Sequence, residues 1–129
     1  MKFIWNDDHM ETTSFNYGTL KIAPDDAVGF RPFQLLVASI ASCSGSVFHK
    51  ILAKQRTAFD DLTIEAEVER NEEEANRVEK ITLHFTIEGK DLNEKKLQRN
   101  LEISRKNCSM VQSVKDSIEV VEHLTVVQK

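Results

Sequence analysis

The segment FQLLVASIASCSGSVFHKIL, which begins at Phe33, restricts the fold of this chain more than any other part of the sequence. Large apolar residues recur in it at helical spacing: Leu36, Ile40, Val47 and Ile51. The spacing predicts a helix from Phe33 to about Gln55, with Pro32 at its first position, where the missing N–H costs nothing. Because this helix is apolar nearly all the way round, we expect it at the centre of the fold.

Small side chains surround a single thiol in the middle of this predicted helix. The stretch ASCSGS carries Cys43, and Gly45 is the residue that interrupts the apolar pattern. A helix face made of alanine, serine and glycine lets another backbone approach closely. We therefore expect these residues to make room for a partner helix or for a substrate.

Two alternating segments after the helix predict a β-hairpin. In LTIEAEVER, residues 62–70, apolar and polar side chains alternate as in a half-buried antiparallel strand. ITLHFTIEG, residues 81–89, has the same alternation, and the acidic stretch NEEEAN between the two segments is expected to form a solvated turn. Val78 is out of phase with the second strand, which indicates either a β-bulge or a later strand start.

Shorter elements complete the predicted fold. Residues 2–5 and 17–23 have strand character, and a second helix is expected from about Asn93, with a break at residues 107–109. The chain is expected to close with a strand over residues 118–129. The order of strands, helix, hairpin, helix and strand predicts an α+β fold.

Composition limits the class of protein and of partner. At 129 residues the chain is expected to form a single domain over residues 1–129. Its composition, 40% hydrophobic and 29% charged, is that of a soluble globular protein, and the formal net charge of −4 excludes the basic footprint needed for nucleic acid or anionic lipid. No signal peptide is expected, and the longest apolar stretch, residues 33–48, is expected to be too short to cross a bilayer. We therefore expect a cytoplasmic protein that does not bind membranes.

The chain has two cysteines, Cys43 and Cys108, and the second ends a helical stripe: Leu97, Leu101, Ser104 and Cys108. In the cytoplasm both are expected to be reduced thiols, and their spacing excludes a CxxC motif or a zinc ribbon. They are either buried structural residues of some other enzyme or interaction domain, or a reactive pair. The second interpretation is favoured by central helices and by the break at Cys108, where the free N–H groups of a helix start would lower the pKa of that thiol.

Other kinds of site find little support in the sequence. The four histidines are scattered, and Cys43 and His49 fall on different faces of the predicted helix, so no metal site is expected. The sequence contains no glycine-rich loop that would hold phosphate and no motif that activates a serine. We expect neither a metal nor another cofactor.

Two motifs resemble the segments around the two cysteines of the OsmC/Ohr family, the osmotically inducible and organic hydroperoxide resistance proteins. GFRPFQLLVASIASC resembles the start of that family's central helix, and NCSMVQSV resembles its second site, in which a proline usually follows the cysteine. The resemblance covers roughly residues 17–127. The spacing of the two cysteines and the hairpin between them agree with it.

The resemblance implies an intertwined α+β homodimer, in which antiparallel sheets of both chains wrap around two long central helices and the active sites lie at the interface. It also implies a thiol-dependent peroxidase that reduces organic hydroperoxides in oxidative-stress defence. Cys43 would attack the peroxide and become a sulfenic acid, and Cys108 would condense with it to a disulfide. A thiol reductant, of the dithiol or lipoyl type, would return the pair to thiols.

Active members of the family have a glutamate shortly before the first cysteine and pair it with an N-terminal arginine. Phe33 and Gln34 lie nearest to that position here, and Arg31 is the first arginine of the chain. From the resemblance we expect Gln34 and Arg31 beside the thiols, and Phe30, Phe33 and Met110 along an apolar substrate pocket. The departures also support an alternative with the same fold: a catalytically weak or inactive protein that binds an apolar small molecule at the dimer interface or senses redox state.

Overall fold

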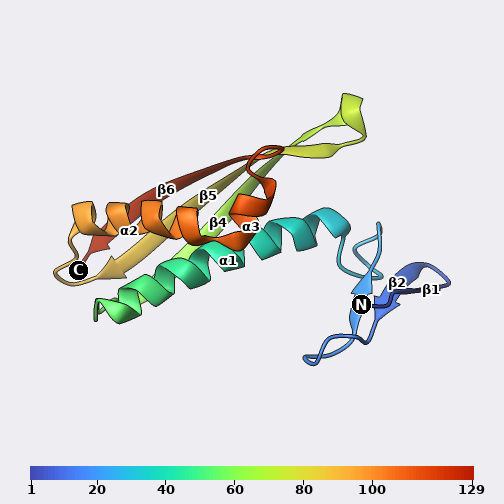
Figure 1. Ribbon diagram of the computed structural model, residues 1–129, viewed down its shortest axis with the longest axis horizontal. Coiled ribbons are helices and arrows are strands. Elements are labelled where there is room, and N and C mark those ends of the chain that lie inside the picture. Colours follow the sequence, from blue (N-terminus) through green and yellow to red (C-terminus); the bar gives the residue numbers. More distant parts are fainter. The chain divides into compact units, whose positions relative to one another are not determined.

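The computed structural model describes residues 1–129, and its contacts divide them into two units, Met1–Ala38 and Ser39–Lys129, each of which is described by itself. The chain contains two β-sheets and three α-helices (Figure 1), so the predicted α+β class is confirmed. The prediction of a single domain over residues 1–129 stays a prediction.

The first unit contains a small antiparallel sheet with three strands, β1 (Ile4–Asn6), β2 (His9–Thr12) and β3 (Leu20–Ile22). β1 and β3 overlap the two predicted strands, whereas β2 was not predicted. After β3 the chain turns back onto that strand, and the Phe30 N–H donates to the Lys21 carbonyl at 2.9 Å. Gly29 makes this return feasible, because a Cβ at its position would lie 2.9 Å from the Lys21 carbonyl oxygen.

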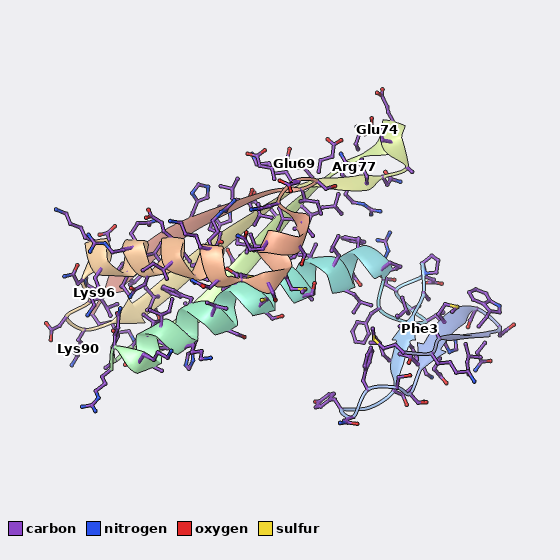
Figure 2. The ribbon with its side chains drawn as sticks, in the orientation of Figure 1. Phe3, Glu69, Glu74, Arg77, Lys90 and Lys96 are labelled. Carbon is purple, nitrogen blue, oxygen red and sulfur yellow. The ribbon has the colours of Figure 1, made fainter.

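The second unit is built on a sheet in the order β4 (Asp61–Asn71), β5 (Arg77–Gly89) and β6 (Glu119–Gln128). β4 and β5 form the predicted antiparallel hairpin, and β5 begins before Val78, so the strand does not start late; the register instead shifts between Glu69 and Arg70, opposite Val78. A short 3-10 helix, η1 (Glu72–Glu74), makes the turn, and the side chains of Glu74 and Arg77 mark this end of the hairpin in Figure 2. β6 pairs with β5 in the parallel direction.

Three helices accompany the strands: α1 (Pro32–Lys54), α2 (Glu94–Asn107) and α3 (Ser109–Val114). α1 begins at Pro32 as predicted, and α2 begins after Asn93, whose side chain accepts the Lys96 N–H at 3.1 Å and so caps the helix. The predicted break between the second helix and its continuation is confirmed and falls at Cys108. In the second unit, α1 and α2 lie along the same face of the sheet (Figure 1).

The core of the second unit lies between these helices and the inner face of the sheet. The predicted inward residues of β5 are all buried: Ile81, Leu83, Phe85 and Ile87. The predicted stripe of α2 is buried as well: Leu97, Leu101, Ser104 and Cys108. Phe48 of α1 packs edge-to-face on Phe85, with ring centroids 5.6 Å apart. On β4 the predicted inward side chains are only half-buried, and Ala66 is exposed.

The predicted buried stripe of α1 is partly wrong. Of its members only Ile40 is buried, whereas Leu36, Val47 and Ile51 are half-buried. The side chains that α1 buries are Ile40, Ser44, Gly45, Phe48 and Leu52. Most of these lie at steps of four on the side that meets the sheet, and the second apolar side of the helix is only partly covered within the chain.

Gly45 lets α1 approach β4 of the same chain closely. A Cβ at Gly45 would lie 2.5 Å from the Cδ1 atom of Ile64, which is too short for a contact between carbon atoms. The space that the sequence predicts for a partner helix or a substrate is therefore occupied at this position by Ile64.

By length and mean hydropathy, α1 would be able to cross a bilayer, since it has 23 residues and a mean hydropathy of 1.5 in its most apolar window. The expectation that its apolar stretch is too short therefore does not hold for the whole helix. The core helix of a soluble protein passes the same test. Within the chain 28% of this window is buried, and Ile40, Phe48 and Leu52 have no exposed surface.

Candidate functional site

The structure brings the two cysteines together. Cys43 lies in the middle of α1, and Cys108 lies between α2 and α3, with the two thiols close enough for each to shift the pKa of the other. Ser109 adds a hydroxyl to the same site, with its Oγ 3.7 Å from Cys43 Sγ. Both cysteines are free thiols, Cys43 half-buried and Cys108 buried. The site therefore holds a partly accessible sulfur beside an enclosed one.

A sharp break between α2 and α3 places Cys108 against α1. Cys108 has an extended backbone, with φ −83° and ψ 109°, and it is both the last cap of α2 and the first cap of α3. Its N–H donates to the Arg105 carbonyl at 3.4 Å, and its own carbonyl accepts the Gln112 N–H at 3.0 Å. The first is an i→i−3 bond that closes the end of α2, and the second is the first i→i−4 bond of α3, so the Cys108 corner is held at both sides.

Burial disfavours the thiolate of Cys43, but hydrogen bonds outweigh it and lower the pKa of Cys43 below its ordinary value. The donors are the backbone N–H of Met110, the Cys108 thiol, and the hydroxyl and backbone N–H of Ser109. All come from the start of α3 or from the residue that caps it. Cys43 is therefore the thiol that is more readily ionised.

Burial raises the pKa of Cys108, and the neighbouring Cys43 sulfur raises it further. The sequence predicts the opposite direction, namely that the helix start lowers the pKa of Cys108. That prediction is wrong because Cys108 caps α3 while its thiol is buried, and the N–H groups of Ser109 and Met110 serve the sulfur of Cys43 as well. The two thiols are thus unequal, with Cys108 the one that stays protonated.

Ser109→Ala is expected to raise the pKa of Cys43, because it removes the hydroxyl donor and leaves the backbone donors in place. Below the pKa, the rate of alkylation follows the thiolate fraction, so we expect alkylation of Cys43 by iodoacetamide to slow by roughly three- to tenfold. The matched control is Ser113→Ala, since that hydroxyl donates to the Ser109 carbonyl at 2.7 Å. An unchanged alkylation profile in Ser109→Ala would show that its hydroxyl does not stabilise the thiolate.

The other predicted site residues divide between the two units. Met110 lies beside the thiols, with its N–H toward Cys43 and its side chain 36% exposed. The remaining four belong to the first unit: Phe30, Arg31, Phe33 and Gln34. There the Gln34 side chain accepts the Arg31 N–H at 3.1 Å, and the Arg31 guanidinium lies 4.8 Å from the centre of the Phe33 ring. Their role at the thiols stays a prediction.

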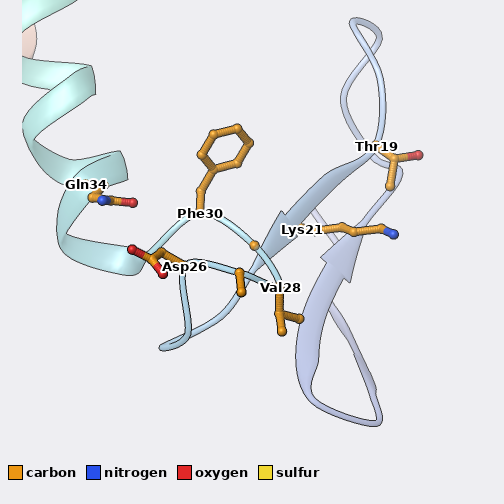
Figure 3. Close-up of a pocket in the computed structure, with 8 residues that line it drawn as sticks. Thr19, Lys21, Asp26, Val28, Phe30 and Gln34 are labelled. Carbon is orange, nitrogen blue, oxygen red and sulfur yellow. The ribbon is translucent and has the colours of Figure 1, made fainter.

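The first unit has a pocket of its own, of about 610 Å³ (Figure 3). Phe30 and Val28 supply apolar surface to its lining, and Thr19, Lys21 and Gln34 supply polar groups. This volume is in the usual range for small-molecule sites. The pocket thus contains one predicted pocket residue, Phe30, and one predicted catalytic residue, Gln34.

His84 and His123, which pair across β5 and β6, stack with ring centroids 5.4 Å apart. Glu67 adds a carboxylate oxygen 3.5 Å from His84 Nε2. Nowhere in the chain do three or more histidine, cysteine or acidic side chains come together in a way that could hold a metal ion.

The sequence did not indicate Glu122, a carboxylate buried beneath the thiol site. It lies on the inner face of β6, its side chain is 4% exposed, and Ser44 Oγ donates to its Oε2 at 2.9 Å. Arg105 Nη1 is 3.9 Å from Oε1, too far for a hydrogen bond, and Oε1 has no hydrogen-bonding partner. Burial raises the pKa of Glu122, although the Ser44 hydroxyl and the Arg105 charge act in the other direction.

Glu122→Gln is expected to remove part of the pH dependence of stability. Because the pKa of Glu122 is raised in the folded state, its proton stabilises the fold fully below the ordinary value of 4.5, and this contribution is lost as the pH rises through the folded pKa. Between pH 4.5 and the folded pKa, the free energy of unfolding of Glu122→Gln should therefore rise relative to that of the wild type. Above the folded pKa the difference between the two proteins should be constant. Urea unfolding between about pH 4 and 8 measures this. Parallel curves for both proteins would contradict it, and Glu119→Gln, at an exposed position of the same strand, is the control.

Comparison with known proteins shows the family and the fold to which the chain is similar. The family model described as OsmC-like protein matches residues 24–123. Protein YhfA of Escherichia coli K12 is 27% identical over 97 residues, which cover 74% of this chain and 72% of that protein. The crystal structure of a hypothetical protein from Aquifex aeolicus VF5 superposes with a TM-score of 0.86 at 25% identity, over 99% of this chain and 95% of that one.

The organic hydroperoxide resistance protein OhrB of Bacillus subtilis has a TM-score of 0.68 at 19% identity, over 96% of this chain and 95% of that one, and so shares the fold. The family match spans most of the chain and includes both cysteines. The chain therefore belongs to the OsmC-like protein family.

Proposed function

We propose that this chain is a cytoplasmic thiol peroxidase that reduces organic hydroperoxides through Cys43 and Cys108. The observation that carries the proposal is the unequal environment of two adjacent thiols, since the pKa of Cys43 is lowered and that of Cys108 is raised. A peroxidatic thiol must be available as thiolate, and a resolving thiol is needed only after the first has been oxidised. Membership of the OsmC-like family and the shared fold with an organic hydroperoxide resistance protein support the same reaction.

In the first step the Cys43 thiolate attacks the terminal oxygen of a hydroperoxide ROOH. An S–O bond forms, the O–O bond breaks, and Cys43 becomes a sulfenic acid, while the alkoxide takes a proton from solvent and leaves as ROH. In the second step the Cys108 sulfur attacks the Cys43 sulfur. An S–S bond forms, the S–O bond breaks, and hydroxide leaves as water with the Cys108 proton. An external dithiol then reduces the disulfide by exchange and becomes a disulfide itself.

The proposal keeps the predicted roles of the pocket and catalytic residues. Met110 contributes a partly exposed, flexible apolar side chain next to Cys43, which suits the tail of an organic hydroperoxide. The roles of Arg31 and Gln34 as partners of the thiolate, and of Phe30 and Phe33 along the pocket, rest on the resemblance to the family.

The proposed enzyme is a homodimer, because each unit leaves apolar surface uncovered. In the first unit Ile4, Trp5 and Phe30 are 56%, 62% and 59% exposed. In the second unit a groove between α1 and α2 is lined by Val47, Ile51 and Ile103 together with Lys50, Lys54 and Asn107. Uncovered surface of this kind marks an interaction site in a soluble protein. A second copy of the chain is the partner that family membership supports.

The experiment that tests the proposed function mixes the reduced protein with cumene hydroperoxide or linoleic acid hydroperoxide in a stopped-flow instrument. One equivalent of hydroperoxide should be consumed per pair of thiols, and peptide mapping should then find a Cys43–Cys108 disulfide. Hydrogen peroxide serves as the comparison for organic substrates. A thiol titre that is unchanged after this treatment would falsify the peroxidase assignment.

A second candidate is a redox-inert or redox-sensing protein of the same fold that binds an apolar small molecule. The observation in its favour is the pocket in Figure 3, where a neutral Gln34 stands near the position that carries a glutamate in active relatives. Native mass spectrometry of the purified protein would show a bound lipid-like molecule. Finding it together with a Cys43 that is alkylated no faster than a free cysteine would favour this candidate over catalysis.

A further inference from the structure

Glu122 connects the two segments that carry the cysteines. Ser44, which directly follows Cys43 in α1, donates to one carboxylate oxygen of Glu122 at 2.9 Å. Arg105, three residues before Cys108, faces the other oxygen at 3.9 Å. A single side chain on β6 thus contacts the neighbour of the first thiol and lies in ion-pair range of the helix end that leads to the second.

The backbone carbonyl of Arg105 is bonded to the Cys108 corner. Its carbonyl accepts the Cys108 N–H at 3.4 Å and the Gln112 side-chain N–H at 3.2 Å. The last turn of α2, Cys108 and the middle of α3 are therefore bonded to the residue whose guanidinium faces Glu122. A displacement of Arg105 would move Cys108 with it.

We propose that Glu122 is a positioning residue that holds the Cys43 and Cys108 sulfurs at the separation from which they form a disulfide. It does so by fixing Ser44 of α1 and Arg105 of α2 to the same point of β6. The inference rests on the proposed function only in that it takes the two thiols to be a redox pair. Glu122 itself does not contact the reacting atoms.

The cost of burying this group supports a role other than stability. A carboxylate that is taken out of water is expensive, and a well-packed apolar residue in its place is often neutral or stabilising. Ser44 from α1 and Arg105 from α2 face it, and Gln98 and Glu102 of α2 line a small cavity with it, whereas Leu83, its partner on β5, offers no polar atom. Glu122, whose Oε1 has no hydrogen-bonding partner, thus lines a cavity of about 70 Å³, room enough for water. This arrangement does little for the core, but it ties α1 and α2 together.

The experiment measures the equilibrium of the Cys43–Cys108 disulfide with glutathione, in which one oxidised glutathione takes up two electrons and two protons from the pair and becomes two reduced molecules. Glu122→Ala removes the hydrogen bond from Ser44 and the ion pair with Arg105, and it is expected to lower the equilibrium constant by about tenfold, which corresponds to roughly 30 mV for this two-electron couple. Ser44→Ala, which removes only the link to α1, is expected to lower it less. Glu122→Gln, which keeps a hydrogen-bond acceptor for Ser44, should fall between Ser44→Ala and the wild type.

Ile87→Val is the matched control for lost stability. Ile87 is fully buried on the same inner face of the sheet, four positions beyond Leu83 on β5. This change should lower the midpoint of urea unfolding, because it removes a buried methyl group from the core. It should leave the disulfide equilibrium of the folded protein unchanged, because the thiols keep their spacing.

The outcomes separate this inference from the proposed function. Equal equilibrium constants in the wild type, Ser44→Ala and both Glu122 variants would overturn the positioning role and leave the peroxidase proposal standing. The wild type could instead form the disulfide with glutathione but consume no hydroperoxide. If the equilibrium constants of the variants then fall in the expected order, the positioning role would be supported and the peroxidase proposal would be overturned. A wild type that forms no disulfide at all would overturn both.

Discussion

Cys43→Ser is expected to abolish hydroperoxide consumption, with a fall in the rate of about a thousandfold or more. A serine hydroxyl in the same place has no ionised form near neutral pH, so the donors from Ser109, Met110 and Cys108 would have no anion to stabilise. The side chains have nearly the same shape, and Cys43 is only half-buried, so the fold should be retained. Stopped-flow consumption of cumene hydroperoxide, with circular dichroism to verify folding, measures the effect.

Cys108→Ser is the matched control, because it changes the other thiol in the same way. Here the first equivalent of hydroperoxide should still be consumed, and the Cys43 sulfenic acid should persist and react with dimedone. Turnover with a dithiol reductant should slow, since the disulfide route is closed. Equal loss of the first equivalent in both serine variants would contradict the assignment of Cys43 as the attacking thiol.

Local patterns in the sequence predicted the β-hairpin and both helix starts well. The hairpin follows from strict alternation, and Val78, which is out of phase, reflects the register shift between Glu69 and Arg70. Pro32 and Asn93 marked the starts of α1 and α2 because each suits the first turn of a helix for a chemical reason of its own. Features that depend on neighbours a few residues away could thus be predicted from the sequence.

The strand register of β6 and the contacts that depend on it could not be predicted from the sequence. The closing strand carries valines on both faces, so alternation alone does not say whether Glu122 or His123 points inward. The parallel register with β5, which pairs Glu122 with Leu83, decides it. Hydrophobic spacing likewise indicates Val47 and not Ser44 as a member of the buried face, because a serine gives no hydrophobic signal, although Ser44 has no exposed surface. The buried pair of Ser44 and Glu122 is therefore visible only in the structure.

The nearness of Cys43 and Cys108 was predicted, whereas the direction of the pKa shift of Cys108 was predicted incorrectly. The prediction that the helix start at residues 107–109 lowers a thiol pKa named Cys108, the cysteine next to the break in the sequence. In three dimensions the donor groups at the start of α3 reach across to α1 and lower the pKa of Cys43. Which sulfur receives the hydrogen bonds depends on how two helices pack, and no spacing along one helix contains that information.

Gly45→Leu is expected to lower the free energy of unfolding by about 3 kcal/mol, at the upper end of the cost of overpacking a core. Even a Cβ at this position would lie 2.5 Å from Ile64 Cδ1, and the rest of a leucine side chain would have to fit between α1 and β4. Gly45→Ala is the informative contrast. The Ile64 methyl is the free end of a side chain and can rotate away, while alanine gains about 1 kcal/mol over glycine in a helix interior, so this variant should be close to neutral. Urea unfolding of both variants measures the difference.

Ile64→Ala should restore part of the stability that Gly45→Leu loses, because it opens the space on β4 that the new side chain needs. A double-mutant cycle over the two positions is therefore expected to show a favourable coupling, on the order of 1–2 kcal/mol. Because the clash lies within one chain, the double variant should regain the folded state. In analytical ultracentrifugation it should then show the same oligomeric state as the wild type. A Gly45→Leu protein of normal stability, or a cycle without coupling, would mean that Gly45 does not hold α1 against β4, and the helix that carries Cys43 would then be positioned by other contacts.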